Sequence, residues 1–469
     1  MALTIGACSG GGSPTPAPTS TPVNQPPVFS SAASASVVEN TAAAFYSAVA
    51  SDPQGLAITY SITGGADAAA FAISGNQLAF VAAPNYDLSG DTDGNNVYLV
   101  QLRASDGLMS STLDLQVTVT NSKEGIAVKR VATGFVDPVA IAAIPGDTHL
   151  FVAERGGKIY SLDPATGVKT LFQTLSVSTD GDRGLRALAV SPDYATTGRY
   201  FVLYSGASGH VVLDGCRRSG TFGSPECGSP GVVGGEAHAR TDDYGAFMGY
   251  GSDGKLYVAT GDAGGSQDPD GSAQRDSSIL GKLLRVDNNP DPYAGASPRF
   301  FIVTTIAKGF HNPRGGGFYN GNLLLGDRGA TAKEEVDLVS LSGSGNYGWP
   351  AMEGTTTLST PVPAGANGPV IEYPHVAGGG ITGGFVYRGQ VTSLQNHYVF
   401  ADQGGTIYSL QAASIVAGQT LGPSKLERRT LDFAADAGAI DTPVAFGEDN
   451  AGELYIVDSD GEIFRVTTG

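Results

Sequence analysis

The chain has 469 residues, of which 67 are glycine, and only 15% are charged. This composition disfavours long helices and favours short strands joined by tight turns. The net charge of −18, from 27 basic and 45 acidic residues, would repel a phosphate backbone and excludes nucleic acid as an expected partner. No run of 18 apolar residues occurs, so no membrane-spanning helix is predicted.

Residues 1–26 are predicted to form a tether without a hydrophobic core, because they are rich in Gly, Ser, Pro and Thr. The segment Ile5-Gly6-Ala7-Cys8 resembles a bacterial lipoprotein cleavage site, which implies a lipid on Cys8 as the membrane attachment. The apolar stretch before Cys8 is too short for a signal peptide, so a truncated leader and a chance cysteine both stay open. The resemblance predicts an extracytoplasmic bacterial lipoprotein, in the periplasm, at the outer membrane or on the cell surface.

Residues 27–122 have the pattern of a β-sandwich. About six short runs of alternating or β-branched residues are separated by turn clusters such as SDPQG and SGDTDGNN, and this density of strands is typical of a sandwich. Four acidic residues stand at the ends of these runs: Glu39, Asp52, Asp87 and Asp106.

These acidic positions, with the PPVF start of the segment, resemble a cadherin-like repeat. In that family such carboxylates gather at one pole and bind calcium, an ion that prefers hard oxygen ligands. The resemblance implies a metal site made of the four acidic residues and an arm that contacts a cell-surface glycan or protein. The linker motif is reduced to residues 121–124 and no second repeat follows, so carboxylates that only cap turns remain the alternative.

From Ile126 to the C-terminus a strand–turn–strand unit recurs. A unit of this kind cannot cover both of its own faces, and radial stacking of the units buries them. Six copies over 126–469 predict a six-bladed β-propeller; a β-helix would need shorter and more uniform repeats. The copies lie at 149–163, 199–213, 255–287, 322–341, 397–410 and 453–466.

Two cysteines, Cys216 and Cys227, lie 11 residues apart in a Gly-rich stretch. In an oxidising compartment this spacing favours a local disulfide. Two free thiols are the alternative.

Several motifs over 126–469 resemble the soluble glucose/sorbosone dehydrogenase family, a six-bladed propeller that uses pyrroloquinoline quinone (PQQ). The resemblance implies an aldose or related alcohol as substrate, PQQ and calcium as cofactors, and an electron acceptor that the sequence does not identify. The motifs are GSDGKLYVATGD (251–262), GFHNP (309–313), EEVDLV (334–339), GNYGWP (345–350) and TGGFVYRG (382–389).

The position of the catalytic base departs from the family pattern. In the family a His stands eight residues before the Gly that opens the GSDG-like turn, and counting back from Gly251 reaches Asp243. An Asp is a weaker base than a His, with ordinary pKa values near 3.9 and 6.5, although burial would raise the pKa of Asp243. His238, five residues upstream, is the other candidate, and a carboxylate without catalytic duty is the alternative.

The remaining site residues follow from the same resemblance. His311 replaces an Arg that helps to hold substrate and cofactor, whereas Asn312 is kept and Arg314 stands nearby. Guanidinium groups can pair with the carboxylates of the cofactor, which implies this role for Arg183 and Arg388. The backbone carbonyls of the residues that match the family's calcium pair would bind the ion: Gly329 and Ala330.

Three functions remain open at this stage. The first is a PQQ- and calcium-dependent dehydrogenase of aldoses, anchored at the surface. The second is a degenerate propeller that serves as a calcium-supported glycan-binding or adhesion lipoprotein. The third is a lactonase-type hydrolase, which would need an inner ring of carboxylates around a metal. An active dehydrogenase predicts Asp243, His311, Arg183 and Arg388 around one axial pocket. Tyr347 and Trp349 are expected to pack the core of a blade, with stacking against the cofactor as the alternative.

Overall fold

The computed structural model describes Leu3 and residues 23–206, 208–218, 225–227, 240–287, 301–376 and 379–469. Contacts divide the chain into two units, Met1–Thr120 and Asn121–Gly469. The described residues are nearly all strand or turn, which confirms the predicted all-β class, and none of their helices is long and apolar enough to cross a membrane. Cys8, most of the tether and His238 lie outside the described residues.

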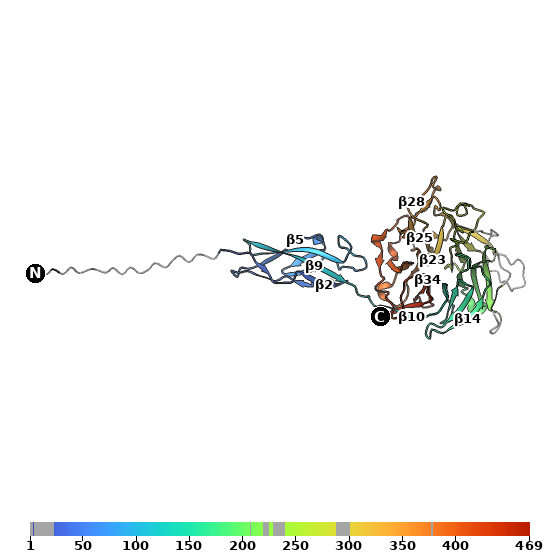
Figure 1. Cartoon of the computed structure of the whole chain (residues 1–469), viewed down its shortest axis with the longest axis horizontal. Coiled ribbons are helices and arrows are strands. Elements are labelled where there is room, and N and C mark those ends of the chain that lie inside the picture. The colour runs from blue at the N-terminus through green and yellow to red at the C-terminus, as the bar shows by residue number, and fades with distance from the viewer. Residues whose placement is uncertain are drawn as a thin grey trace. The chain divides into compact units, whose positions relative to one another are not determined.

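The first unit is a β-sandwich, as predicted (Figure 1). Strand β8 alternates between buried and exposed positions along its length, and its inward residues join a cluster of aromatic and aliphatic side chains between the sheets. The larger sheet has the order β2 (Ser34–Val38), β9 (Ser110–Thr120), β8 (Val97–Ser105) and β5 (Thr59–Gly64). The smaller elements are β3 (Tyr46–Ser47), β7 (Gln77–Phe80) and β6 (Phe71–Ser74), the pair β1 (Val28–Phe29) and β4 (Ala50–Ser51), and η1 (Ala68–Ala70).

The four acidic residues of this unit lie at two ends of the sandwich. Glu39 follows β2, which pairs with the last residues of β9, and Asp87 follows Tyr86, whose N–H donates to Glu39 at 2.8 Å. Asp106 lies in the hairpin that begins β9. The 11 residues of β9 separate the two ends by ~35 Å, so the expected gathering at one pole is not found.

At the Asp106 end, local backbone groups occupy the carboxylates. Asp52 accepts the N–H groups of Gln54 and Leu56 at 2.8 and 2.9 Å. Asp106 accepts the N–H of Leu108 at 2.7 Å. Both residues therefore close turns, the alternative that the sequence left open.

The described residues of the second unit form six blades around a ring (Figure 1). Each predicted repeat supplies the two middle strands of one blade. The first three blades are β11 (Pro138–Ala143), β12 (Leu150–Glu154), β13 (Lys158–Leu162) and β14 (Lys169–Thr174); β15 (Leu185–Val190), β16 (Arg199–Ser205), β17 (Val211–Arg218) and β18 (Pro225–Cys227); and β19 (Phe247–Tyr250), β20 (Leu256–Thr260), β21 (Lys282–Val286) and β22 (Val303–Lys308), with β26 (Gly345–Asn346) at the edge.

Blades four and five are joined by a bridge between Gly315 and Gly383, and the C-terminal strands form blade six. Blade four is β23 (Asn312–Tyr319), β24 (Asn322–Arg328), β25 (Lys333–Ser340) and β29 (Ile371–Pro374), and blade five is β30 (Ile381–Val386), β31 (His397–Asp402), β32 (Thr406–Gln411) and β33 (Glu427–Arg428). Blade six is β34 (Pro443–Glu448), β35 (Leu454–Asp458), β36 (Ile463–Thr468) and β10 (Ile126–Ala132). Short elements between them are α1 (Tyr194–Thr197), β27 (Met352–Glu353), β28 (Thr356–Thr357), η2 (Thr392–Leu394), η3 (Ala412–Ser414) and η4 (Pro423–Lys425).

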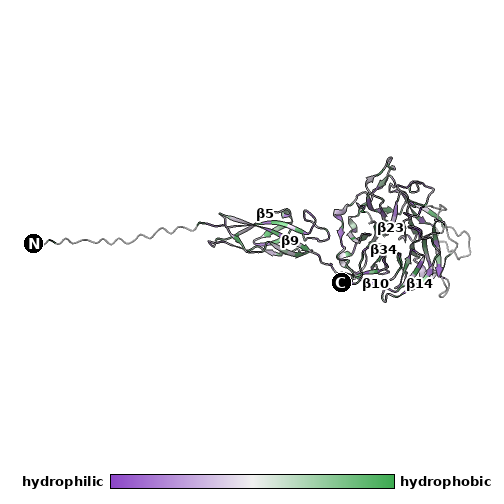
Figure 2. Cartoon of the chain, viewed as in Figure 1, coloured by the Kyte–Doolittle hydropathy of each residue, from purple (hydrophilic) through white to green (hydrophobic). Residues whose placement is uncertain are grey.

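The ring closes because β10, the first strand of this unit, pairs antiparallel with β36, the last. The strands nearest the axis, which begin each blade, pack against one another around the whole ring. Hydrophobic residues concentrate on the strands (Figure 2), where side chains of neighbouring blades bury one another. This rigid ring brings the loops that precede the inner strands to one end of the central channel.

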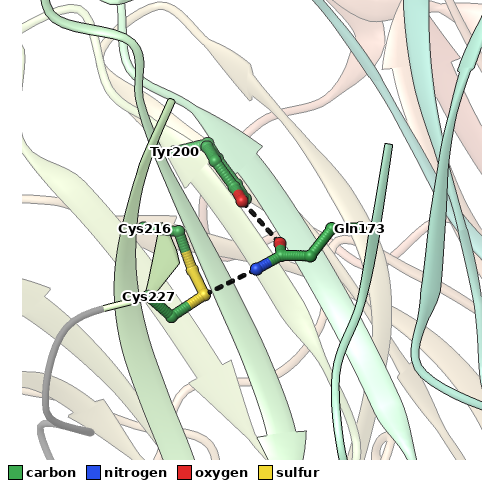
Figure 3. Close-up of a disulfide and its surroundings, with 4 residues drawn as sticks. All are labelled: Gln173, Tyr200, Cys216 and Cys227. Atoms are coloured by element: carbon green, nitrogen blue, oxygen red, sulfur yellow. Dashed lines mark hydrogen bonds between the residues drawn. A yellow bond between two sulfur atoms is a disulfide. The ribbon is translucent and has the colours of Figure 1, made fainter. Parts of the chain in front are cut away.

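The predicted disulfide is formed between Cys216 and Cys227 (Figure 3). It links β17 to the edge strand β18, whose residues pair across the bond. Gln173 donates to the sulfur of Cys227 at 3.1 Å and accepts the hydroxyl of Tyr200. The disulfide therefore fixes the outer edge of blade two, and Gln173 of β14 links that edge to blade one.

Candidate functional site

One cavity of about 470 Å³ lies at the end of the channel where the inner strands begin. It collects side chains from blades two, three and four, which the ring places side by side. Six of the residues predicted from the sequence line it: Asp243, His311, Asn312, Arg314, Gly329 and Ala330.

Asp243, His311 and Asn312 form a hydrogen-bonded group on one wall. The amide of Asn312 donates to Asp243 at 2.7 Å, and Nε2 of His311 lies 3.4 Å from the other carboxylate oxygen. Nδ1 of His311 donates to the carbonyl of Arg328 at 2.6 Å. Asp327 fixes the start of β23, because it accepts the N–H groups of both His311 and Asn312, at 2.9 and 2.6 Å.

The protonation states of His311 and Asp243 depend on how close the two side chains lie to each other and to neighbouring carboxylates. Burial alone would lower the pKa of His311, but Asp243, Asp262 and Asp327 outweigh burial and raise it to about 9. Burial favours a higher pKa for Asp243, yet its hydrogen bond and charge interaction with His311 hold the pKa below the usual value. At neutral pH the pair is therefore an imidazolium and a carboxylate, and the expected rise in the pKa of Asp243 does not occur.

Asp262 is a site residue that the sequence reasoning missed, although it ends one of the quoted motifs. Its carboxylate accepts the indole N–H of Trp349 at 2.7 Å, and burial raises its pKa to about 7. Trp349 is 2% exposed and its ring centroid lies 4.4 Å from that of His311. Tyr347 stacks on Phe310 inside the blade, as expected.

Two ion pairs that share Asp182 lie at the bottom of the cavity. Arg314 pairs with Asp182 at 2.6 Å, and Arg186 pairs with the other oxygen of Asp182 at 3.1 Å. Burial first, and then the charge of Arg314, lower the pKa of Arg186 to about 9. Arg328 also lines the cavity and donates to the carbonyl of Gly379 at 2.8 Å. Arg186 and Arg328 were not predicted from the sequence.

Arg183 and Arg388 do not occupy the places expected of them among the described residues. Arg183 is buried behind the wall, where it donates to the Tyr244 hydroxyl at 3.1 Å and to the Arg240 carbonyl at 3.0 Å. Arg388 pairs with Glu448 at 2.7 Å, and both line the wider channel of about 780 Å³. Because Arg388 follows the end of β30, it lies ~20 Å from the end where the strands begin.

Among the described residues of the second unit, three groups could offer oxygen or nitrogen ligands for a metal ion. Gly329 and Ala330, whose carbonyls the family resemblance assigns to calcium, line the cavity. Asp243, Asp262 and His311 have ligand atoms within 4.8 Å of one another. So do three buried carboxylates behind the wall, of which Asp337 has no hydrogen-bond partner among the described residues: Asp327, Glu335 and Asp337.

The sequence profile of the glucose/sorbosone dehydrogenase family matches residues 135–417. The chain belongs to this family. Two solved structures share the propeller fold: the PQQ-bound aldose sugar dehydrogenase of Streptomyces coelicolor, with 22% identity over 73% of this chain and 98% of that chain and a TM-score of 0.55, and the apo-form of the soluble aldose sugar dehydrogenase of Escherichia coli, with 17% identity over 73% and 100% and a TM-score of 0.54. At this identity the likeness shows the fold alone.

Curated relatives bear other names. HIPL1 protein of Arabidopsis thaliana is 30% identical over 268 residues, which cover 46% of this chain and 38% of that protein. Hedgehog-interacting protein of Mus musculus is 25% identical over 382 residues, which cover 73% and 52%. The chain thus spans less than two thirds of the length of each of these relatives.

Proposed function

We propose that this family member is a PQQ- and calcium-dependent dehydrogenase of aldoses or related alcohols. The observation that supports this most strongly is the cavity itself, which brings together six residues that lie up to 87 positions apart, from 243 to 330, and that the family resemblance implied. The identity of the sugar and of the electron acceptor is left open by this set of residues.

The cavity suits the cofactor in size and in charge. Its volume of about 470 Å³ falls within the usual range for small-molecule sites. PQQ is flat and carries three carboxylates, and the guanidinium groups of Arg314 and Arg328 are the groups that pair best with carboxylates. The carbonyls of Gly329 and Ala330 would hold the calcium ion.

A bound PQQ would supply the acceptor for the hydride of the substrate, and a calcium ion would supply Lewis-acid chemistry. The chain itself binds and orients the sugar: Asn312 and Asp243 offer a donor and an acceptor to its hydroxyls. His311, whose Nε2 lies 3.4 Å from the carboxylate of Asp243, holds that carboxylate in place. Trp349 and the Arg314–Asp182 pair close the wall and floor and keep water out.

We propose an extracytoplasmic location, for which the disulfide between Cys216 and Cys227 is the supporting observation. Anchoring through a lipid on Cys8 and a role of the sandwich in contacting a glycan or protein remain part of the same proposal.

A second function, ligand binding without chemistry, is favoured by one specific observation. Asp243 and His311 face each other at 3.4 Å and neutralise each other's charge, an arrangement that a propeller without redox activity could keep. Two relatives named Hedgehog-interacting protein belong with this alternative.

Calorimetric titration with PQQ, with and without calcium, separates the two functions. We expect the chain to bind PQQ in calcium and Arg328→Gln to weaken binding about 10-fold or more, because a charge-assisted hydrogen bond contributes ~1.5–3 kcal/mol. Arg388→Gln is the matched control, since it removes the same group at the other end of the channel, and it leaves the Kd unchanged. Absence of binding by the folded chain in calcium would favour the second function.

A further inference from the structure

A second imidazole, His375, lines the cavity and has its own buried partner. It follows β29, where its backbone N–H donates to the carbonyl of Ala332 at 3.0 Å. Its Nδ1 is hydrogen-bonded to Glu334 of the neighbouring strand β25, and 16% of the side chain is exposed. One edge of the ring is therefore fixed in the blade, and the ring borders the same space as Asp243 and His311.

The side chain of Glu334, the hydrogen-bond partner of His375, is held rigidly. Its side chain has no exposed surface, and its second oxygen accepts the N–H groups of Gly329 and Ile381, at 3.2 and 2.8 Å. One oxygen of Glu334 is thus held by the backbone of the blade, and the other meets Nδ1 of His375. A carboxylate bound at Nδ1 fixes the tautomer and leaves the lone pair on Nε2.

The hydrogen-bonded group of Asp243, His311 and Asn312 is poorly placed to accept a proton from a substrate. Asp243 is paired through both oxygens with His311 and Asn312. Both ring nitrogens of His311 are engaged as well, Nδ1 with the carbonyl of Arg328 and Nε2 with Asp243. Oxidation of an alcohol nevertheless requires a group that accepts the hydroxyl proton while the hydride leaves.

We propose that His375, oriented by Glu334, is the general base of the reaction, an inference that rests on the proposed dehydrogenase function. The substrate O–H bond breaks and its proton passes to Nε2 of His375. The carbon-bound hydrogen leaves with its electron pair to the quinone, and the C–O bond becomes a carbonyl. Glu334 stabilises the imidazolium until it releases the proton to water, so that atoms and charge balance.

The tautomer of His375 can be read in the protein without cofactor. Side-chain ¹⁵N spectra of the full chain, which has six histidines, are assigned with His375→Gln. In the neutral imidazole we expect Nδ1, which faces Glu334, to carry the proton and Nε2 to be bare, and Glu334→Gln to weaken this preference. A proton found on Nε2 with a bare Nδ1 would overturn the inference.

Kinetics of the PQQ-loaded chain then test the role itself. His375→Gln is expected to lower kcat by roughly 10²–10⁴-fold, with KM within a few-fold and an unchanged Kd for PQQ. The matched control is His397→Gln, because His397 is also a buried histidine near a glutamate, Glu427 at 3.7 Å, but lies in blade five away from the cavity. This control keeps its kcat.

The outcomes distinguish the two proposals. An active chain in which His375→Gln keeps its kcat contradicts the base assignment and leaves the dehydrogenase function standing. A wild-type chain that binds PQQ but oxidises no sugar contradicts both.

Discussion

Trp349, the single tryptophan of the chain, lies against the ring of His311 and donates its indole N–H to Asp262. The charge state of His311 depends on the surrounding carboxylates, which raise its pKa to about 9. Because the raised pKa belongs to the folded state, the pairing stabilises the fold fully below about pH 6.5, the ordinary value. This contribution is lost as the pH rises through about 9.

We expect the fluorescence of Trp349 to report this titration. A protonated imidazole in contact with an indole quenches its emission, so the intensity rises with a midpoint near pH 9. His311→Asn removes the transition, and the free energy of unfolding of the wild type, but not of this variant, falls between pH 6.5 and 9 by on the order of 3 kcal/mol. A transition that survives in His311→Asn would show that another group is responsible.

Among the elements, β10 is the strand that closes the ring, because it pairs with β36. It is seven residues long and supplies the outer strand of the C-terminal blade, where Ile126 and Val128 are each 2% exposed. Without it, β36 would have a free edge and the two side chains would leave the blade core. The closure of the ring therefore joins the beginning of the propeller to its end.

A chain that begins at residue 121 is expected to unfold at nearly the same temperature as the propeller within the full chain. A chain that begins at residue 134, which lacks β10, loses about 3–6 kcal/mol of unfolding free energy, since each buried aliphatic side chain contributes ~1.5–3 kcal/mol. Thermal unfolding followed by circular dichroism compares the two. Equal transition temperatures would mean that β10 does not close the ring.

Over the whole molecule, the blades could be predicted from sequence because each is a local strand–turn–strand unit with its own alternation and turn residues. The cavity residues Asp243, His311 and Gly329 could be predicted because their motifs stand at the beginnings or ends of strands. Proximity across blades could not, because Asp182 of blade two and Arg314 of blade four meet only when the blades stack. Arg328 and His375 belong to the same blade as His311 and were missed because they lie outside the quoted motifs. The place of Arg388 was wrong because a motif does not reveal at which end of a strand its last residue emerges.

The distribution of charge over the molecule favours binding of the proposed anionic cofactor at the cavity. The chain carries a net charge of −18, yet Arg186, Arg314 and Arg328 gather where the cavity meets the channel. An anionic cofactor is therefore attracted to this end of the ring.

The most direct test of the account is the reduction of protein-bound PQQ in a single turnover. The full chain is loaded with PQQ and calcium and mixed rapidly with an aldose, and the absorbance of the quinone is followed. We expect at least one member of an aldose panel to reduce the bound quinone, and His375→Gln to lose this step. A folded, PQQ-loaded chain whose quinone stays oxidised with every aldose would contradict the central claim.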